Sequence, residues 1–308
     1  KSTIPGYRLE TRSGASTVGP ATLENDYDDW LPSLIVRVEP ADTVVFRMAY
    51  SRSLGRPNYS QLSPGGTLSY EAGTVANTFE GSFSSGNATL APYRAHNIDM
   101  TGEYYFARGG MLSVGVFAKF IDNPIFTQST LLTDVDFGGR RFARLTISQP
   151  QNARSADIIG VEAAFQQQLT FLPGLLSGLG IELTGTLVDA RLKLPNGRSS
   201  QFPQQSEFLY GAQLFYQRGP VEASVAYHNT GASLIAAGGV AYQDQYNDDL
   251  RRLDAKISVE VIPGITLFAE GQNLTDEPTR QYQGDNTDWI IQNERYGRTF
   301  WGGVSARF

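Results

Sequence analysis

Residues 294–308 read ERYGRTFWGGVSARF, and their second half alternates between two kinds of side chain. A period of two predicts a β-strand with one apolar face. Such a strand promotes aggregation when it is left as an open edge, and a closed barrel removes the edge. The stretch therefore favours a barrel. One parity holds Phe300, Gly302, Val304, Ala306 and Phe308, and the other holds Thr299, Trp301, Gly303, Ser305 and Arg307.

The same alternation recurs along most of the chain. In residues 253–261, Leu253, Ile257 and Val259 are opposed by Lys256 and Glu260. Runs of this kind bounded by turn residues predict antiparallel strands. About eleven strands are predicted, over residues 33–39, 44–51, 97–106, 112–120, 159–168, 179–187, 208–216, 221–228, 253–261, 265–272 and 299–308.

The connections between these strands alternate between short turns and long loops. Turns are predicted at residues 40–42, 108–110, 218–220 and 263–264, and the stretches between successive hairpins are long and polar. This arrangement puts all turns at one end and all loops at the other. Short periplasmic turns with long extracellular loops are typical of outer-membrane barrels.

Full charges occupy mainly one of the two faces of the predicted strands, and the other face carries almost none. A soluble sandwich would place the charged face outside, whereas the loop asymmetry favours lipid outside and water or a plug inside. The sequence therefore predicts an all-β, transmembrane, antiparallel up-and-down barrel. The charged face carries Arg37, Arg47, Asp99, Glu103, Lys119, Glu162, Glu182, Asp254, Lys256, Glu260 and Glu270.

The composition excludes some classes of partner and of functional site. The 308 residues carry a net charge of -6, which argues against a nucleic-acid partner because phosphate binding needs clustered Lys and Arg. There is no cysteine, and His96 and His228 are the only histidines. We therefore predict no metal site. No cofactor and no catalytic residue are assigned.

The strand count bears on domain organisation. Bacterial single-chain barrels have even numbers of strands, so an odd count indicates a missed strand or part of a larger barrel. We expect residues 1–28 to be a loop leading into the barrel. Residues 29–308 are expected to be the C-terminal half of a barrel of about twenty-two strands.

Several phrases, taken together and in order, resemble one family. The chain is similar to the C-terminal barrel portion of TonB-dependent outer-membrane receptors, in particular the group found in Caulobacter- and Xanthomonas-like bacteria. The phrases are WLPSLIVRVEP (30–40), VVFRMAYSRSLGRPNYSQLSP (44–64), ATLAPYRAHNIDMTGEYYF (88–106), GVFAKFIDNPIF (115–126), LFAEGQNLTDEP (267–278) and residues 294–308.

The resemblance implies an integral protein of the Gram-negative outer membrane. It implies import of a scarce nutrient, such as a siderophore, cobalamin, a carbohydrate or an aromatic compound. The TonB complex would drive import through a plug and a short box, neither of which matches any part of this sequence. Lipid, lipopolysaccharide and the barrel-assembly machinery are further expected partners, and Phe308 is the expected assembly signal.

Loop aromatics are the candidate ligand contacts. Recognition is commonly placed on loops carried by a rigid barrel, and aromatic rings beside Asp, Asn and Gln suit a sugar or an aromatic ligand. Packing of the loops against one another is the alternative explanation. The candidates are Tyr59, Tyr70, Phe126, Phe142, Tyr242, Tyr246 and Trp289.

Two other functions remain open at this point. An outer-membrane barrel enzyme of the phospholipase or protease kind would need a histidine near a nucleophile, and His96 with Asn97 and Ser51 is the cluster to test. A passive porin would show steady conductance and a loop that constricts the pore.

Overall fold

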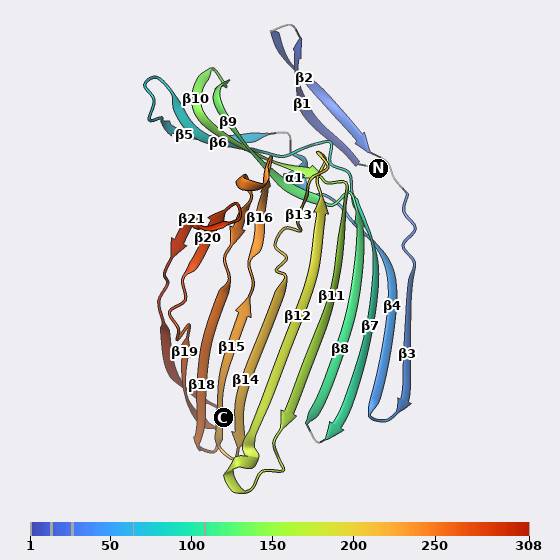
Figure 1. Cartoon of the computed structure of the whole chain (residues 1–308), viewed down its shortest axis with the longest axis vertical. Coiled ribbons are helices and arrows are strands. Elements are labelled where there is room, and N and C mark those ends of the chain that lie inside the picture. The colour runs from blue at the N-terminus through green and yellow to red at the C-terminus, as the bar shows by residue number, and fades with distance from the viewer. Residues whose placement is uncertain (1, 13–14, 26–27, 64, 108, 308) are drawn as a thin grey trace.

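The computed structural model describes residues 2–12, 15–25, 28–63, 65–107 and 109–307. Within them the chain is almost entirely β-structure, arranged as one long-stranded wall, a second sheet beside one end of it, and a separate hairpin (Figure 1). No helix in these ranges is long and apolar enough to cross a membrane.

The wall contains eleven long strands, all paired antiparallel with their neighbours, in the order β22-β19-β18-β15-β14-β12-β11-β8-β7-β4-β3. This confirms the all-β antiparallel fold and the predicted count. The strands are β3 (Ser33–Ala41), β4 (Val44–Gly55), β7 (Tyr93–Ala107), β8 (Gly110–Asp122), β11 (Ser155–Gln168), β12 (Leu179–Lys193), β14 (Phe208–Arg218), β15 (Val221–Thr230), β18 (Leu250–Ile262), β19 (Ile265–Gln272) and β22 (Thr299–Ala306), with the short β13 (Ser199–Gln201) paired to β12.

All tight turns lie at one end of the wall, the lower end in Figure 1. Gly219 and Gly264, in the turns β14–β15 and β18–β19, adopt φ of 56° and 82°. This left-handed conformation is accessible to glycine at no steric cost, which explains the two Gly turns. The β11–β12 connection spans the same residues as predicted, 169–178, and it is longer than the other turns because it includes a 3-10 helix, η1 (Gly174–Gly178).

Neither face of the wall's central span is covered by a second protein layer in the described residues. Ile257 is 47% exposed on one face, and Lys256 and Glu260 are exposed on the other. A soluble sheet would bury its apolar face against another layer. The uncharged face is therefore left for a non-aqueous surrounding.

The long connections form their own eight-stranded sheet, in the order β21-β20-β17-β16-β9-β10-β6-β5. We call it the loop sheet. Two of its pairings, β10 with β6 and β16 with β9, are parallel and join connections that are distant in sequence. Its strands are β5 (Gly66–Ala72), β6 (Phe79–Ser85), β9 (Ile125–Phe137), β10 (Arg140–Asn152), β16 (Ser233–Gly238), β17 (Gln245–Asn247), β20 (Thr279–Gln283) and β21 (Asn286–Glu294); the short helices α1 (Tyr59–Leu62) and η2 (Ala241–Gln243) lie in the same connections.

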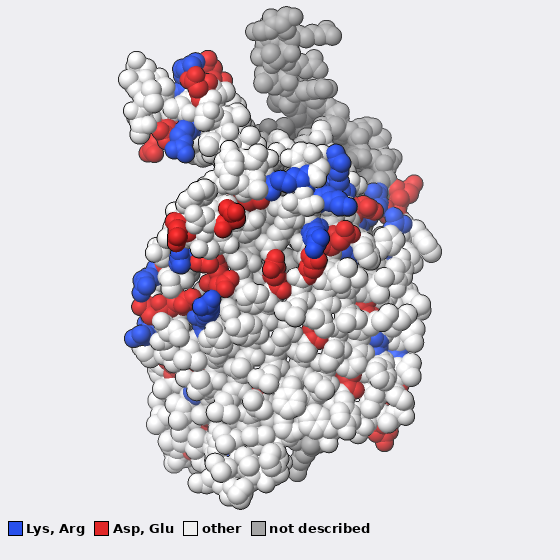
Figure 2. Space-filling model, in the orientation of Figure 1, with Lys and Arg blue, Asp and Glu red and all other residues white. Residues whose placement is uncertain are grey.

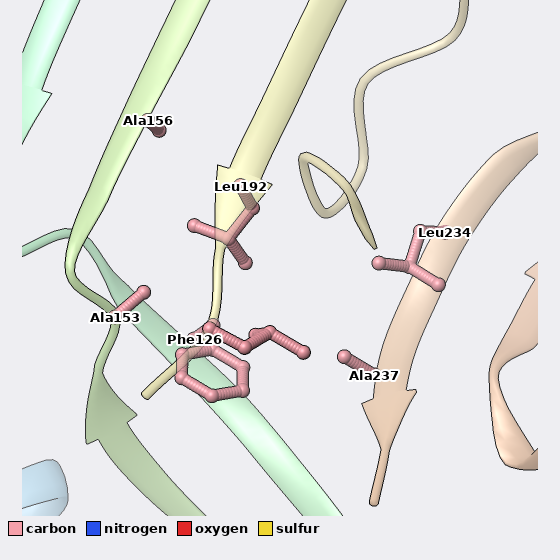
Figure 3. Close-up of a cluster of buried hydrophobic side chains, with 7 residues drawn as sticks. Phe126, Ala153, Ala156, Leu192, Leu234 and Ala237 are labelled. Atoms are coloured by element: carbon pink, nitrogen blue, oxygen red, sulfur yellow. The ribbon is translucent and has the colours of Figure 1, made fainter. Parts of the chain in front are cut away.

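A buried apolar cluster joins the loop sheet to the upper part of the wall (Figure 3). Ala156 of β11 and Leu192 of β12 belong to it, and they share their parity with Glu162 and Glu182. The loops therefore fold over the charged face of the wall, which makes that face the interior one. The cluster consists of Phe126, Ala153, Ala156, Leu192, Leu194, Leu234 and Ala237.

The outward face of the wall changes character near its loop end. On β12 the outward positions pass from Leu187, 61% exposed, to Asp189 and Arg191, which form an exposed ion pair at 2.9 Å. Figure 2 shows the corresponding division, with charged side chains gathered above a broad, almost uncharged surface. An apolar band bounded by polar side chains is what a lipid-facing barrel wall requires.

Two predictions need correction or qualification. Residues 1–28 were expected to be a loop, but β1 (Ser2–Arg12) and β2 (Ala15–Asn25) form an antiparallel hairpin outside the wall. Gly and Pro residues within both strands hide the alternation that would have revealed them. Phe308, the expected assembly signal, lies outside the described residues.

Candidate ligand-binding site

The loop sheet brings four separate connections together at one place. Strands β5 and β6 come from the β4–β7 connection, β9 and β10 from β8–β11, β16 and β17 from β15–β18, and β20 and β21 from β19–β22. Because these strands are hydrogen-bonded into one sheet, each loop is held in place by the others. The result is a fixed polar surface above the interior of the wall.

An irregularity in β10 places a cation on this surface. Phe142 pairs with Phe79, whereas Arg144 pairs with Glu80, so β10 holds one residue more than β6 between the two pairs. Phe79 and Glu80 are consecutive in β6 and point to opposite faces. Phe142 and Arg144 therefore also point to opposite faces, and the β-bulge turns Arg144 toward Glu80.

The face of Arg144 carries a pocket of about 290 Å³ whose walls come from all four connections. Most of its lining side chains are polar. Amides and hydroxyls provide both hydrogen-bond donors and acceptors. The lining residues are Glu80, Gly81, Ser129, Leu131, Arg144, Thr146, Gln243, Gln245 and Gln283.

Much of the hydrogen-bonding capacity of the pocket is unused by the protein. In the described part of the chain, the side chains of Arg144, Thr146, Gln243 and Gln245 have no hydrogen-bond or ion-pair partner. Arg144 and Glu80 are register partners without forming an ion pair. Glu80 accepts one hydrogen bond, from Thr74 Oγ1 to its Oε1 at 3.1 Å, so its other oxygen, the guanidinium of Arg144 and the free amides are available to a bound molecule.

A largely buried ion pair stabilises the segment that forms one wall of the pocket. Arg198, in the β12–β13 connection, donates two hydrogen bonds to Asp244, from Nη1 to Oδ2 at 2.7 Å and from Nη2 to Oδ1 at 2.9 Å. The backbone N–H of Gly238 donates to the same carboxylate at 2.7 Å. Asp244 lies between Gln243 and Gln245, so this network fixes the segment that lines the pocket.

Two of the predicted aromatic contacts lie beside the pocket. Gly284 follows Gln283, and a Cβ built on it would lie 3.3 Å from the Cα of Tyr242 and 3.6 Å from the ring of Trp289. Gln283 donates from Nε2 to the carbonyl oxygen of Tyr242 at 3.1 Å. Tyr242 and Trp289 are 59% and 53% exposed, so both rings are accessible to a ligand.

Tyr246 belongs to the same region but is partly buried. Its ring stacks on that of Tyr282, with centroids 5.3 Å apart and planes inclined by 15°. Burial is the main cause that raises the pKa of the Tyr246 hydroxyl, and the nearby carboxylate of Asp244 adds to it. Tyr246 therefore stays neutral over the physiological range and contributes packing beneath the surface.

The other predicted aromatics have different positions. Phe126 and Phe142 are buried, so as candidate ligand contacts they are corrected to packing residues. Phe142 lies 6.0 Å from Phe79 and 6.2 Å from Tyr70, centroid to centroid, and Arg140 lies over the Tyr70 ring. The buried positions follow from the loop sheet, whose apolar face needs large side chains.

Tyr59 is 93% exposed in the short helix α1 and does not line the pocket. The sequence reasoning also missed residues that do line it. Arg144 and the three glutamines lie in stretches without regular periodicity, and only the polar runs QDQYNDD (243–249) and QYQ (281–283) mark their segments.

The cluster considered for catalysis is not assembled. His96 Nδ1 is 2.9 Å from the hydroxyl oxygen of Tyr50, whereas Asn97 donates to Ser51 Oγ at 3.3 Å. His96 pairs with Arg52 and Asn97 pairs with Ser51, so His96 and Ser51 point to opposite faces of the wall. A histidine on one face cannot take a proton from a serine on the other.

A larger apolar groove of about 750 Å³ lies on the wall rather than on the loop sheet. Outward-facing residues such as Met100, Val116 and Val161 line much of it. This is the face that we assign to lipid, so the groove is part of the apolar surface. The loop-sheet pocket remains the candidate site.

Comparisons with known proteins agree with this architecture. Residues 2–274 match the family model described as TonB dependent receptor-like, beta-barrel. None of the curated proteins matches the sequence. The likeness to solved structures concerns the fold, because the identities are low.

Three solved structures illustrate that likeness. The ferric enterobactin receptor from Pseudomonas aeruginosa, solved with enterobactin, aligns with a TM-score of 0.61 at 18% identity, over 99% of this chain and 43% of that one. The copper transporter OprC aligns with a TM-score of 0.63 at 17% identity, over 98% of this chain and 43% of that one. The FrpB iron transporter from Neisseria meningitidis aligns with a TM-score of 0.59 at 13% identity, over 97% of this chain and 41% of that one.

The chain thus spans about two fifths of the length of these structures. Its wall corresponds to part of their barrels. By the extent of the family match, the chain belongs to the TonB dependent receptor-like β-barrel family, a non-enzymatic family of the Gram-negative outer membrane.

Proposed function

We propose that this chain is part of an outer-membrane receptor that captures a small polar nutrient in the loop-sheet pocket and imports it. The observation that carries the proposal is the convergence of four loops on one pocket above the charged face of the wall. Loops that served only to connect strands would not need to be hydrogen-bonded into one sheet. A fixed polar pocket there suits the capture of a molecule from outside the cell.

Import requires energy when the nutrient is scarce. The family supports TonB as the energy source, acting on a short box and on a plug that would fill a barrel of about twenty-two strands. The structural neighbours include transporters of siderophores, iron and copper. The candidate cargo classes for this chain are a siderophore, cobalamin, a carbohydrate and an aromatic compound.

The remaining partners follow from the location of the wall. Outer-membrane lipid and lipopolysaccharide would cover the uncharged face, and the barrel-assembly machinery would insert the protein, with Phe308 as its signal. The sequence similarity over residues 30–126 and 267–308 supports placement in the group found in Caulobacter- and Xanthomonas-like bacteria. Tyr242 and Trp289 are the aromatic residues that we propose as ligand contacts.

Growth of cells that carry or lack the complete receptor tests the proposal. Both strains are grown on a panel of sole carbon and iron sources, with and without a functional TonB complex. We expect a growth advantage from the receptor on at least one source, and we expect that advantage to vanish without TonB. An advantage that persists without TonB would indicate a passive pore, and no advantage on any source would refute uptake.

A further inference from the structure

We infer that the loop-sheet pocket selects an uncharged, polyhydroxylated ligand, a short saccharide of one or two rings. This inference rests on the proposed function and specifies its cargo. Its basis is the chemistry of Arg144, Glu80 and the three glutamines, together with the rings of Tyr242 and Trp289.

The charge of the pocket argues against an anionic cargo. Among the described residues that line it, Arg144 is the only cation and Glu80 the only anion, so this lining has no net charge. A strongly anionic ligand would leave Glu80 repelling it, and like charges brought together disfavour binding. Among the described residues there is also no group of three His, Cys, Asp or Glu side chains placed to hold a metal ion. A neutral ligand is compatible with both charges, because each charge forms a strong hydrogen bond with a hydroxyl group.

The amides match a ligand that both donates and accepts hydrogen bonds. A glutamine side chain offers an acceptor oxygen and two donor hydrogens, and a hydroxyl group offers one donor and two acceptor sites. Gln243 and Gln245 have both ends of their amides free within the described chain, and Gln283 uses only Nε2. Adjacent hydroxyl groups on a sugar ring would pair with such planar side chains two at a time.

The aromatic rings complete the match. One face of a sugar ring presents mainly C–H groups, which are stabilised when they pack against an aromatic ring and leave water. Tyr242 and Trp289 lie against Gly284, one residue from Gln283 of the pocket, and both are exposed. Polar side chains would thus form hydrogen bonds with the hydroxyl groups of the sugar, while the aromatic rings pack against its apolar face.

The volume of the pocket limits the size of the ligand. About 290 Å³ is at the lower end of the volumes of small-molecule sites. One or two sugar rings fit such a space, with a second ring extending toward Trp289. A large metal chelate would project from the pocket and leave most of these polar groups unused.

Isothermal titration calorimetry on the complete receptor in detergent micelles tests the inference. The neutral probes are maltose, sucrose, cellobiose and xylobiose, and the anionic probes are glucuronate and ferric citrate. We expect saturable binding of at least one neutral probe and at least tenfold weaker binding of both anionic probes. Anionic probes that bind more tightly than every neutral probe, or an absence of binding by all neutral probes, would overturn the assignment.

Two glutamine variants test whether the neutral probe binds in this pocket. Gln245→Ala is expected to weaken binding of the neutral probe about tenfold, the loss expected when one or two hydrogen bonds are removed. Gln217→Ala is the matched control, because Gln217 is exposed near the turn end of the wall. Equal effects from both variants would refute the location.

The aromatic contribution is tested in the same way. Trp289→Ala is expected to weaken binding of the neutral probe about tenfold, and Trp30→Ala, which removes another exposed tryptophan, is expected to leave it unchanged. Unchanged binding in Trp289→Ala would remove the ring from the site.

Failure of the saccharide assignment and failure of the proposed function give different results. If only the ligand class is wrong, the neutral probes do not bind but the TonB-dependent growth advantage remains. If the function is wrong, the growth advantage is absent or independent of TonB, whatever the calorimetry shows.

Discussion

The wall and the loop sheet are both antiparallel-rich β-structure, yet they are stabilised in opposite ways. The wall is one layer thick over its central span, with Val116 and Ile257 exposed and uncharged on its outward face. The loop sheet buries Phe142 and Leu145 completely and leaves its polar residues on the other face. The wall therefore needs a lipid surrounding to be stable, whereas the loop sheet has the packing of a soluble protein.

The two regions therefore differ in where a binding site can form. A wall that must satisfy lipid on one face has little freedom in its outward residues. The loop sheet lies beyond the apolar band, so its polar face is free to carry a specific set of side chains. Substitutions that act on one region and spare the other test the comparison.

The largest loss of stability is expected for Asp244→Ala in the loop sheet. Removing the carboxylate leaves the largely buried guanidinium of Arg198 unpaired, which costs about 3–5 kcal/mol of local stability. Native-state hydrogen exchange should show faster exchange in β16, β17 and β20 and unchanged exchange in the wall. The control is Asp136→Ala, which breaks an exposed ion pair with Arg141 and should cost about 0–1 kcal/mol.

Equal protection losses in the two variants, or a loss that extends to β11 and β12, would contradict the separation of the two regions.

The second-largest loss of stability is expected for Val161→Lys in the wall. Val161 faces outward within the apolar band, and a lysine near the middle of a bilayer costs about 2–4 kcal/mol. The matched control is the neighbouring Glu162→Lys, which changes a side chain on the charged interior face. Urea unfolding of the receptor in lipid vesicles should show a lower midpoint for Val161→Lys alone. A similar loss in both variants would refute the assignment of the faces.

A smaller effect is expected for Gly284→Ala. Gly284 has φ of 71° and lies against Tyr242, so an alanine there would be strained by about 1–2 kcal/mol. Gly185→Ala in wall strand β12 is the control, because an added Cβ would meet no atom within 4 Å. Limited proteolysis should cut the β20–β21 connection faster in Gly284→Ala, and comparable cleavage in the two variants would argue against strain at Gly284.

The smallest expected effect is a loss of loop-sheet stability at alkaline pH. Burial raises the pKa of the Tyr246 hydroxyl, so the unfolded loop releases that proton at lower pH than the folded one. The folded state then binds more protons, and stability is lost as the pH rises from about 10, the unfolded value, toward the folded pKa. Below pH 10 the effect is absent.

Ultraviolet absorbance of tyrosinate during an alkaline titration measures this effect, with Tyr246→Phe for assignment. The control is Tyr59→Phe, which alters a tyrosine that is exposed in helix α1. If Tyr246→Phe removes only a group that titrates together with the exposed tyrosines, Tyr246 is not buried in solution.

Much of the wall was predictable from the sequence. Leu253, Ile257 and Val259 alternate with Lys256 and Glu260, and a strand of period two admits only one division into faces. The Arg218-Gly219-Pro220 and Pro263-Gly264 turns were equally clear, because few residues adopt their backbone conformations. The hairpin β1–β2 was missed because Gly and Pro interrupt both of its strands.

The site was much less predictable. Tyr242 and Trp289 were identified as loop aromatics, but nothing local distinguished them from Phe126 and Phe142, which are buried. Arg144 would be assigned to the same face as Phe142 by alternation. Only the bulge against β6, a strand more than fifty residues away, turns it to the other face.

The strands, the turns and the division of each strand into a charged and an uncharged side follow from the order of residues, because these features depend on neighbours along the chain. Contacts between distant segments set which loops meet, which aromatic rings are covered and which polar groups share a pocket. Those outcomes depend on parallel pairings between strands far apart in sequence, and such pairings leave no periodic trace in either strand.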